Sequence, residues 1–403
     1  MNERRQNICR TTRGASALRS SGGFSLVELM VAVAVGLIGM LAIMQAFDSN
    51  ERIKRSTTGV GMSQANGAIA LYTLERDIRM GGYGFVQKDA LNCSGFASLQ
   101  WYYGGTYSST TLPSPGGARA PIVLAPIVIQ DGGAAAPDTI TVTYGTDEKV
   151  LIPTVVGNSP PAGQMSVAAN YGFDTNDLML VAQPGACMLY NVTAPVAGDA
   201  ATIIRIATGA TGPFNPPSAT AYSPVIANTS AVMNLGQLVV NKYDVSVSDF
   251  RVTPMFTNIG VAGQLPVYSN LPQVIGNDIV DLRAYYGKDT SQTFTSPPPV
   301  VAGAALTLTW DKIAPTTADG WSQVRVIKVA LLARSGNYEK PNATTGLCDT
   351  TKLGDISLTF NNPMVSTAAG NAAFTIIPDG LPSCYRYRAF ETTIPIRNLI
   401  WRS

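Results

Sequence analysis

Hydrophobic residues are concentrated near the start of the chain in one long run, from Phe24 to Phe47. The run contains a single charged residue, Glu28, and follows a leader in which five arginines accompany one acid. At about 1.5 Å per residue, a helix of this length spans roughly 36 Å, enough to cross a hydrocarbon core of about 30 Å. The pattern therefore predicts a membrane-spanning helix over 24–47, and the length disfavours a buried helix of a soluble core. Because arginine-rich flanks stay in the cytoplasm, we expect everything after Phe47 to lie outside it.

The helical pattern continues beyond the apolar run. Further apolar residues and one glycine recur at spacings of seven, seven, four, three and four, which places them on one face of a helix: Ile53, Val60, Gly67, Leu71, Leu74 and Ile78. Glycines at 59, 61 and 67 each weaken a helix by about 1 kcal/mol relative to alanine, and Gly81 and Gly82 end it. We therefore predict one helix over 24–80. Its second half is amphipathic and packs its apolar stripe on the domain that follows.

From residue 81 onward the pattern changes to short β-branched or apolar runs between turn residues. The 38 glycines and 26 prolines among 403 residues fit a fold with many turns. We expect strands over 138–144, 177–181, 238–247 and 324–332, and a short helix over 278–287 with apolar residues at 279, 282 and 286. The prolines at 297–299 either separate a C-terminal subdomain from about residue 300 or lie in an ordinary surface loop. The predicted fold class is α+β, with the long N-terminal helix packed on a large β-rich domain over 81–403.

Composition excludes several kinds of chemistry. The chain has no histidine, which removes Ser-His-Asp and Cys-His nucleophile systems and histidine-ligated zinc. Asp174, Asn176 and Asp177 are close enough to suggest a calcium loop, but the EF-hand spacing and its distal glutamate are absent, so a turn before a strand is the better interpretation. The net charge of +2 includes a leader with five arginines and one glutamate, so without residues 1–23 the side chains sum to −2. We expect no catalytic residues, metal or cofactor, and no nucleic-acid partner.

Residues Gly23 to Ala32, GFSLVELMVA, resemble the processing site of type IV prepilins and the related pseudopilins. The resemblance implies that residues 1–23 are a leader peptide, that a prepilin peptidase cleaves after Gly23, and that Phe24 is then N-methylated. It also implies that Glu28 helps the subunit to enter a filament. Physically, Glu28 either pairs with the Phe24 amine of a neighbouring subunit or extends to the lipid headgroups.

Later segments resemble the PilW family of minor pilins. They include 74–85 (LERDIRMGGYGF), 138–145, 176–181 with Cys187, 278–287, 324–335 and the tail 385–401. The resemblance implies a pilin-like structural subunit, not an enzyme, which assists initiation and assembly of type IV pili together with other minor and major pilins and the inner-membrane assembly machinery. It further implies a single-pass inner-membrane protein in the lipid bilayer, with a cytoplasmic N-terminus and a periplasmic domain that becomes extracellular in the pilus. The alternatives are a minor pseudopilin of type II secretion and, from a different class, a membrane-tethered extracytoplasmic enzyme or lectin.

The cysteines fit an exported domain. Cys9 belongs to the leader, which leaves Cys93, Cys187, Cys348 and Cys384. Four cysteines in an oxidising compartment suggest two disulfides with three connectivities; we favour Cys348–Cys384, which leaves Cys93–Cys187. Two aromatic clusters, 101–103 and 385–388, either mark a partner surface or pack across strands.

Overall fold

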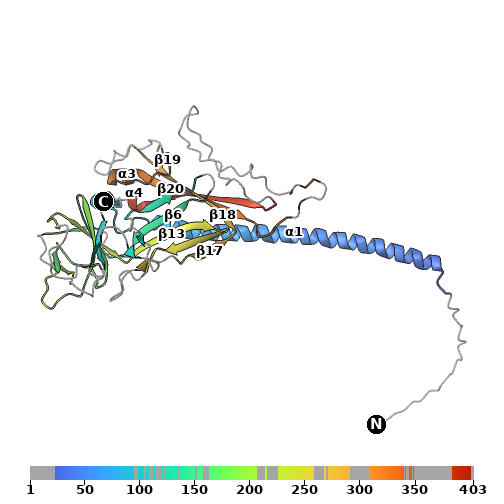
Figure 1. Ribbon diagram of the computed structural model, residues 1–403, viewed down its shortest axis with the longest axis horizontal. Coiled ribbons are helices and arrows are strands. Elements are labelled where there is room, and N and C mark those ends of the chain that lie inside the picture. Colours follow the sequence, from blue (N-terminus) through green and yellow to red (C-terminus); the bar gives the residue numbers. More distant parts are fainter. Residues whose placement is uncertain are drawn as a thin grey trace, which may run out of the picture. The chain divides into compact units, whose positions relative to one another are not determined.

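One long helix and a set of β-sheets make up the chain in a computed structural model (Figure 1). The chain forms two compact units with their boundary between Thr57 and Thr58, and helix α1 (Leu26–Met80) has residues in both. Residues 1–22 of the predicted leader, the proline run 297–299 and the side chains of 101–103 lie outside the described part of the chain. The structure describes residues 23–94, 99–103, 106–108, 112–113, 119–120, 124–133, 136–149, 152–157, 163–206, 214–215, 226–257, 267–268, 271–290, 308–339, 341, 345–346, 348 and 384–400.

Helix α1 ends in a turn rich in glycine. Gly82 and Gly84 have φ of +82° and +88°, a left-handed conformation that glycine adopts without a steric penalty. The amide of Gly82 donates to the carbonyl of Thr143, 2.9 Å away, so the chain leaves the helix beside a strand. The glycines therefore stop the helix and turn the chain into the sheet region.

A five-stranded antiparallel sheet lies next to the C-terminal part of α1 (Figure 1). Two neighbouring inner strands of this sheet, over 139–145 and 238–246, alternate between buried and less buried residues over part of their length, as expected for strands with one face on a core. These two strands overlap the expected strands 138–144 and 238–247. In order across the sheet, the strands are β17 (Gln273–Asn277), β14 (Asp249–Pro254), β13 (Leu238–Ser246), β6 (Thr139–Gly145) and β5 (Ile127–Gln130).

A four-stranded antiparallel sheet follows in the sequence. Its order is β19 (Thr309–Asp311), β18 (Ile279–Lys288), β20 (Val324–Arg334) and β21 (Tyr387–Pro395), with α3 (Ala318–Gln323) before β20 and α4 (Arg397–Ile400) after β21. β18 pairs with β19 and β20. Residues on the two sides of position 300 therefore belong to one sheet.

The expected helix over 278–287 is wrong. These residues form strand β18, which has neighbours on both sides and is buried along almost its whole length. Its isoleucine, valine and two tyrosines are residues that favour strands. The apolar residues at 279, 282 and 286 looked helical because a strand that is buried on both faces carries no alternation.

A third, six-stranded sheet includes one of the expected strands, 177–181, as β9. The order is β2 (Thr106–Ser108), β1 (Leu99–Tyr103), β10 (Ala186–Asn191), β9 (Leu178–Gln183), β12 (Ala231–Gly236) and β7 (Thr154–Val155), with β1 and β10 parallel. Short pairs and helices complete the described elements: β3 (Leu112–Pro113) with β4 (Arg119–Ala120), β8 (Gln164–Ser166) with β11 (Ile203–Arg205), β15 (Phe256–Thr257) with β16 (Val267–Tyr268), α2 (Lys88–Leu91) and the 3₁₀ turn η1 (Asn92–Ser94).

The hydrophobic interior is divided among the sheets. The largest cluster joins Ala70, Leu74 and Ile78 of α1 to buried side chains of the five-stranded and four-stranded sheets. Two further clusters cover opposite faces of the six-stranded sheet, because alternate residues of β9 belong to one and to the other. The C-terminal part of α1 is therefore a core element of the domain.

Candidate functional site

The predicted processing site lies just before the helix. Gly23 has no atom within 4 Å of the position of a Cβ, and the side chain of Phe24 is 84% exposed. Helix α1 begins at Leu26, and its first turn contains Glu28. The bond between Gly23 and Phe24 therefore precedes the helix, and Glu28 lies where the helix dipole favours a negative charge.

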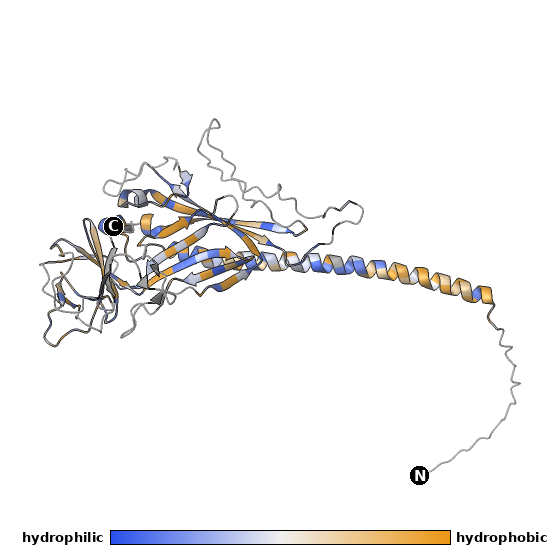
Figure 2. Cartoon of the chain, in the orientation of Figure 1, coloured by the Kyte–Doolittle hydropathy of each residue, from blue (hydrophilic) through white to orange (hydrophobic). Residues whose placement is uncertain are grey.

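Residues 24–47, here called the apolar stem, expose hydrophobic side chains on every side (Figure 2). The described chain has one helix that is long and apolar enough to cross a membrane, judged by length and composition. No residue in the most apolar 18-residue stretch of this helix is buried. A helix that is hydrophobic all round requires lipid or protein around it. Figure 2 also shows hydrophilic turns directly after the stem.

The part of α1 from Thr58 onward packs against the domain through one stripe, here called the inner face. The inner face comprises Gly59, Ser63, Gly67, Ala70, Leu74, Asp77 and Ile78. Ile53 was expected on the same stripe but is exposed, so the stripe starts later than the sequence predicts. Two of the glycines that weaken the helix lie where neighbours approach closely: a Cβ on Gly59 would be 3.3 Å from the Asn337 side chain, and one on Gly67 would overlap the ring of Phe390.

A buried carboxylate fastens the inner face to β13. Asp77 is 2% exposed, and its Oδ2 accepts hydrogen bonds from the Asn241 amide at 2.7 Å and from the Tyr243 hydroxyl at 2.6 Å. Burial, followed by the negative charge of Asp77, raises the pKa of Tyr243 above its ordinary value and that of Tyr144 to about 12. Both tyrosines therefore stay neutral at physiological pH. Two neutral donors satisfy a charge that would otherwise be costly to bury.

The end of the chain holds the end of α1. The side-chain amide of Asn398, in α4, donates to the carbonyls of Met80 and Gly81 at 3.1 Å and approaches that of Arg79 at 3.5 Å. The last carbonyls of a helix have no partner within the helix. Asn398 supplies partners to them from a segment more than three hundred residues away in sequence.

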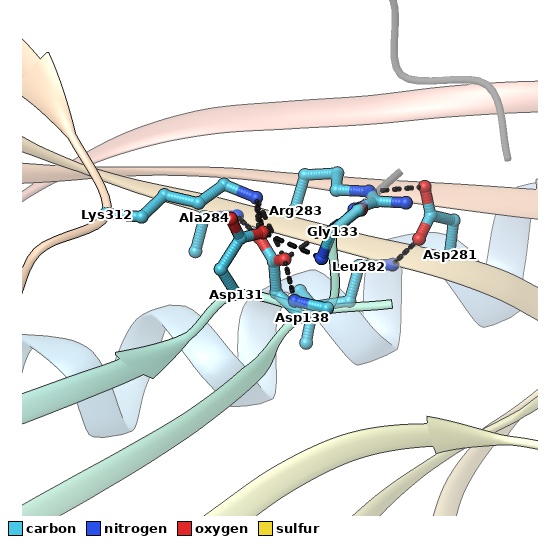
Figure 3. Close-up of polar contacts among 9 residues, drawn as sticks. Asp131, Gly133, Asp138, Asp281, Leu282, Arg283, Ala284 and Lys312 are labelled. Carbon is cyan, nitrogen blue, oxygen red and sulfur yellow. Dashed lines mark hydrogen bonds and ion pairs between the residues drawn. The ribbon is translucent and has the colours of Figure 1, made fainter. Parts of the chain in front are cut away.

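The five-stranded and four-stranded sheets are joined at Asp138 (Figure 3). Its amide donates to the carbonyl of Leu282 at 2.8 Å, and its carboxylate accepts from the amide of Ala284 at 2.9 Å. A single residue before β6 therefore bonds to β18 through both its backbone and its side chain.

Cations surround this fully buried carboxylate. Lys312 Nζ lies 2.9 Å from the Asp138 carboxylate and 2.6 Å from that of Asp131, and Arg283 bridges towards Asp281 at 2.9 Å (Figure 3). Burial lowers the pKa of Lys312, but its hydrogen bonds to Asp131 and Asp138 outweigh this and raise it above its ordinary value. Each carboxylate of the network is paired with a cation, which gives the network a structural role at the junction of the sheets.

The structure brings together the cysteines in the pairs favoured from the sequence. Cys93 and Cys187 form one disulfide with a Cα–Cα distance of 6.0 Å, and Cys348 and Cys384 form another with 5.1 Å. The first links the 3₁₀ turn η1 to β10.

The other candidate groups serve the fold. The Asp177 carboxylate accepts a hydrogen bond from the backbone amide of Asp174, three residues before it, as in a turn. It also accepts one from the Asn234 side chain, and the Asp174 carboxylate pairs with Lys149. Within the described residues, no group of three or more Cys, Asp or Glu side chains could hold a metal ion.

Part of the C-terminal aromatic cluster packs within the domain. Tyr387 is buried, and the Tyr385 ring lies 5.6 Å from that of Tyr338 and 4.5 Å from the Arg334 guanidinium. For these two tyrosines, packing is the better interpretation than a partner surface.

Comparison with known proteins finds matches for two parts of the chain, one at the stem and one in the domain. The family described as Type IV Pilus-assembly protein W matches residues 265–398, and the prokaryotic N-terminal methylation motif matches residues 18–44. Residues 265–398 are therefore similar to PilW-type type IV pilins, and residues 18–44 to a prepilin signal. A type IV-like pilin from Thermus thermophilus is 13% identical, with 61% of this chain and 89% of that chain covered and a TM-score of 0.20. No curated protein matches the chain.

The segment 265–398, which resembles the PilW family, supplies several of the contacts to α1. Phe390 covers Gly67, Asn337 and Ser335 cover Gly59, and Asn398 caps the helix end. The Asn66 side chain also donates to the carbonyl of Asn277 at 3.1 Å. The segment that resembles the family is therefore a large part of the surface that holds the helix.

The sequence analysis missed the polar residues that hold the helix. Asp77 gave a usable signal, because an acid directly before Ile78 and three residues after Leu74 lies on an apolar stripe and has to find partners there. Asn398 gave none, because the carbonyls that it contacts lie more than three hundred residues away, and Asp138 gave none, because its contacts to Ala284 and Lys312 lie more than a hundred residues away.

Proposed function

We propose that this chain is a minor, PilW-type subunit of a type IV pilus that helps to initiate and assemble the filament together with other minor and major pilins. The observation that carries the proposal is the exposed apolar stem, which continues as one helix into a domain that holds its other end through Asp77, Gly67 and Asn398. A stem of this kind suits a subunit that exchanges lipid for other apolar helices.

Processing is the first step of the proposed function. Residues 1–23 are the leader, a prepilin peptidase cleaves after Gly23, and Phe24 is then N-methylated. The exposure of Gly23 and Phe24 ahead of the helix supports this, because proteases act preferentially on exposed chain outside regular structure.

Storage in the inner membrane precedes assembly. Residues 24–47 span the bilayer once, with the N-terminus in the cytoplasm and the domain in the periplasm, and the domain becomes extracellular when the subunit enters the pilus. The two disulfides support an oxidising destination. The subunit is withdrawn from the membrane by the inner-membrane assembly machinery.

Glu28 has a specific part in that transfer. When the stem leaves the lipid headgroups, both its carboxylate and the new amine at Phe24 lose water, and a charge in apolar surroundings is costly unless it is paired. We expect Glu28 to pair with the Phe24 amine of a neighbouring subunit.

The test combines deletion of the gene with complementation. Gly23→Val should leave the leader attached, as shown by the N-terminal sequence of the purified protein. Glu28→Ala should give a cleaved, membrane-inserted protein that is missing from sheared pili. Glu51→Ala is the matched control, because Glu51 is an exposed acid on the same helix that pairs within its own subunit with Arg55 at 3.0 Å.

Three outcomes would contradict the proposal. A mature protein that keeps Met1 would remove the processing step. Normal incorporation of Glu28→Ala would remove the pairing. Normal pili in the deletion strain combined with a secretion defect would indicate a minor pseudopilin instead.

A further inference from the structure

The connection between β6 and β13 is far longer than their pairing requires. The two strands are antiparallel neighbours, with Gly145 at the end of one opposite Leu238 at the start of the other. Strands paired in this way are commonly joined by a turn of two residues. Here residues 146–237 lie between them and contain the strands from β7 to β12. We call these residues the inserted module.

Both ends of the inserted module meet beside the turn that ends α1. The amide of Thr146 donates to the carbonyl of Leu235 at 2.8 Å, and the amide of Gln237 donates to the Thr146 hydroxyl at 2.9 Å. The amide of Gly145 donates to the carbonyl of Tyr83, in that turn, at 2.8 Å. Neither family match, over 18–44 or over 265–398, extends into the module. These two matches therefore give the module no role.

The inserted module has few charges beyond its first turn. Between residues 150 and 237, the charged side chains are Asp174, Asp177, Asp199 and Arg205. Arg205 pairs with Asp199, and Asp174 pairs with Lys149 of the first turn. About a quarter of the residues of a globular protein are normally charged. A ligand that is recognised through its charge, such as a nucleic acid or an anionic lipid surface, therefore fits this module poorly.

An aromatic side chain projects from this surface. Tyr171 is 80% exposed. It is flanked in sequence by Asn170 and Gly172, and small exposed residues lie nearby at Ala169 and at Ala201, whose carbonyl accepts from the Asn170 amide at 2.8 Å. A membrane or a hydrophobic protein surface requires a contiguous apolar patch. An exposed ring among small residues is instead suited to stacking against a flat group.

The backbone around Tyr171 is fixed on both sides. Before it, the Asn170 side chain donates to the carbonyl of Ile203 at 3.0 Å. After it, the side-chain amide of Asn234, which is buried, donates to the carbonyl of Gly172 at 2.7 Å. Binding through a segment that is already ordered costs less conformational entropy than binding through a mobile one. The fold therefore presents the Tyr171 ring in a position that is set before a ligand arrives.

A neutral sugar has the chemistry that this surface can recognise. One face of a sugar ring consists of C–H groups, which pack on the apolar face of an aromatic ring. The sugar hydroxyls both donate and accept hydrogen bonds, so uncharged side chains and backbone groups can pair with them. Neither interaction requires a charge on the protein or on the ligand.

We propose that the inserted module binds a neutral polysaccharide, with Tyr171 stacked on the apolar face of a sugar ring. The inference goes beyond the proposed function, because it assigns a ligand to residues that take no part in holding α1. Since neither side of the contact is charged, its affinity is independent of salt.

A retention assay with a polysaccharide panel tests the ligand class. The full chain in detergent micelles is mixed with particles of cellulose, cross-linked dextran or agarose, which are neutral, and with alginate or chitosan, which are charged. The unbound protein is measured at about 0.02 M and about 0.5 M salt. We expect retention by at least one neutral polysaccharide, equal at both salt concentrations, and no retention by the charged ones.

Substitutions of Tyr171 test the contact itself. Tyr171→Ala should lower the association constant for the retained polysaccharide by at least about tenfold, as for the loss of an aromatic anchor. Tyr171→Phe keeps the ring and should bind like the wild type. Tyr338→Ala is the matched control, because Tyr338 is an exposed tyrosine (58%) of the same domain outside the module. Tyr171→Ala should unfold at the wild-type denaturant concentration, because its side chain is exposed.

Four results would overturn the inference. Failure of every neutral polysaccharide in the panel to retain the protein would exclude the ligand class. Retention by alginate or chitosan that is lost at high salt would indicate an electrostatic contact instead. Binding of Tyr171→Ala at the wild-type level would exclude the stacking contact. Absence of Tyr171→Ala from sheared pili would indicate that the module contacts a neighbouring subunit.

The two proposals fail separately. If Glu28→Ala is excluded from pili but the wild-type chain binds no neutral polysaccharide, the ligand of the module is wrong and the pilin function stands. If the polysaccharide is bound through Tyr171 but Gly23→Val and Glu28→Ala assemble normally, the proposed function is wrong and the module keeps its ligand.

Discussion

The contact between Gly67 and Phe390 allows a quantitative test of how α1 is held. Replacing Gly67 by alanine would place a Cβ 2.6 Å from Cδ2 and 2.8 Å from Cζ of the Phe390 ring, and closer still to Cε2. Replacing Gly61 by alanine adds the same methyl group to the same helix with nothing within 4 Å. The two substitutions therefore differ in packing but share their effect on the helix backbone.

The two substitutions are expected to change the free energy of unfolding in opposite directions. Alanine is favoured over glycine inside a helix by about 1 kcal/mol, so Gly61→Ala should raise the free energy of unfolding by up to that amount. Gly67→Ala gains the same term but overpacks the contact, which typically destabilises by about 1–3 kcal/mol. The difference between the two variants isolates the overlap with Phe390 and should be about 1–3 kcal/mol.

The assay is denaturant unfolding of the full chain in detergent, followed by the fluorescence of the buried Trp321, which lies in the same core as the inner face of α1. Phe390→Leu, which removes the ring edge, should reduce the penalty of Gly67→Ala in a double-mutant cycle. Equal stability of Gly67→Ala and Gly61→Ala would refute the contact. An effect of Gly67→Ala that Phe390→Leu leaves unchanged would show that another neighbour is responsible.

Three further predictions concern the polar contacts of the domain. Asp138→Ala should destabilise by about 3–5 kcal/mol because Lys312 and Arg283 lose a buried counter-charge, and urea unfolding that shows less than 1 kcal/mol would contradict this. Asn398→Ala should lower stability by about 1 kcal/mol and speed amide exchange in the turn after α1; unchanged exchange there would mean that the cap is unimportant. Stability should fall between pH 10 and pH 12 because unfolded tyrosine loses its proton while Tyr144, with a pKa of about 12, keeps it. Tyr144→Phe should show a shallower fall in unfolding free energy over that window, and identical curves would refute the shift.

The sequence predicts the parts of this fold that depend on local pattern. The apolar run after Gly23 and the glycine pair after Met80 place the two ends of α1 to within about two residues. The runs around Val142 and Val240 gave strands for a similar reason, because alternation and β-branching are properties of neighbouring residues.

The other parts of the fold depend on contacts between residues that are distant in sequence. Residues 279–288 form a strand because β19 and β20 lie on either side of it, which no local pattern reveals. Gly59 and Gly67 count against a helix in isolation, yet the domain requires them, because side chains approach the helix too closely for a Cβ. Leu74 and Ile78 were predicted on the packing stripe, and among the polar residues that hold the helix Asp77 had a recognisable sequence signal.

The capping of α1 by Asn398 has a consequence for biogenesis. The residue that completes the C-terminal end of the helix is synthesised more than three hundred residues after the helix itself, so the domain cannot close before Asn398 has been made. Strand β21 and α4 also arrive at this late stage. Until β21 and α4 have been made, the domain is therefore incomplete, and in that interval its unpaired strands are accessible to chaperones and proteases.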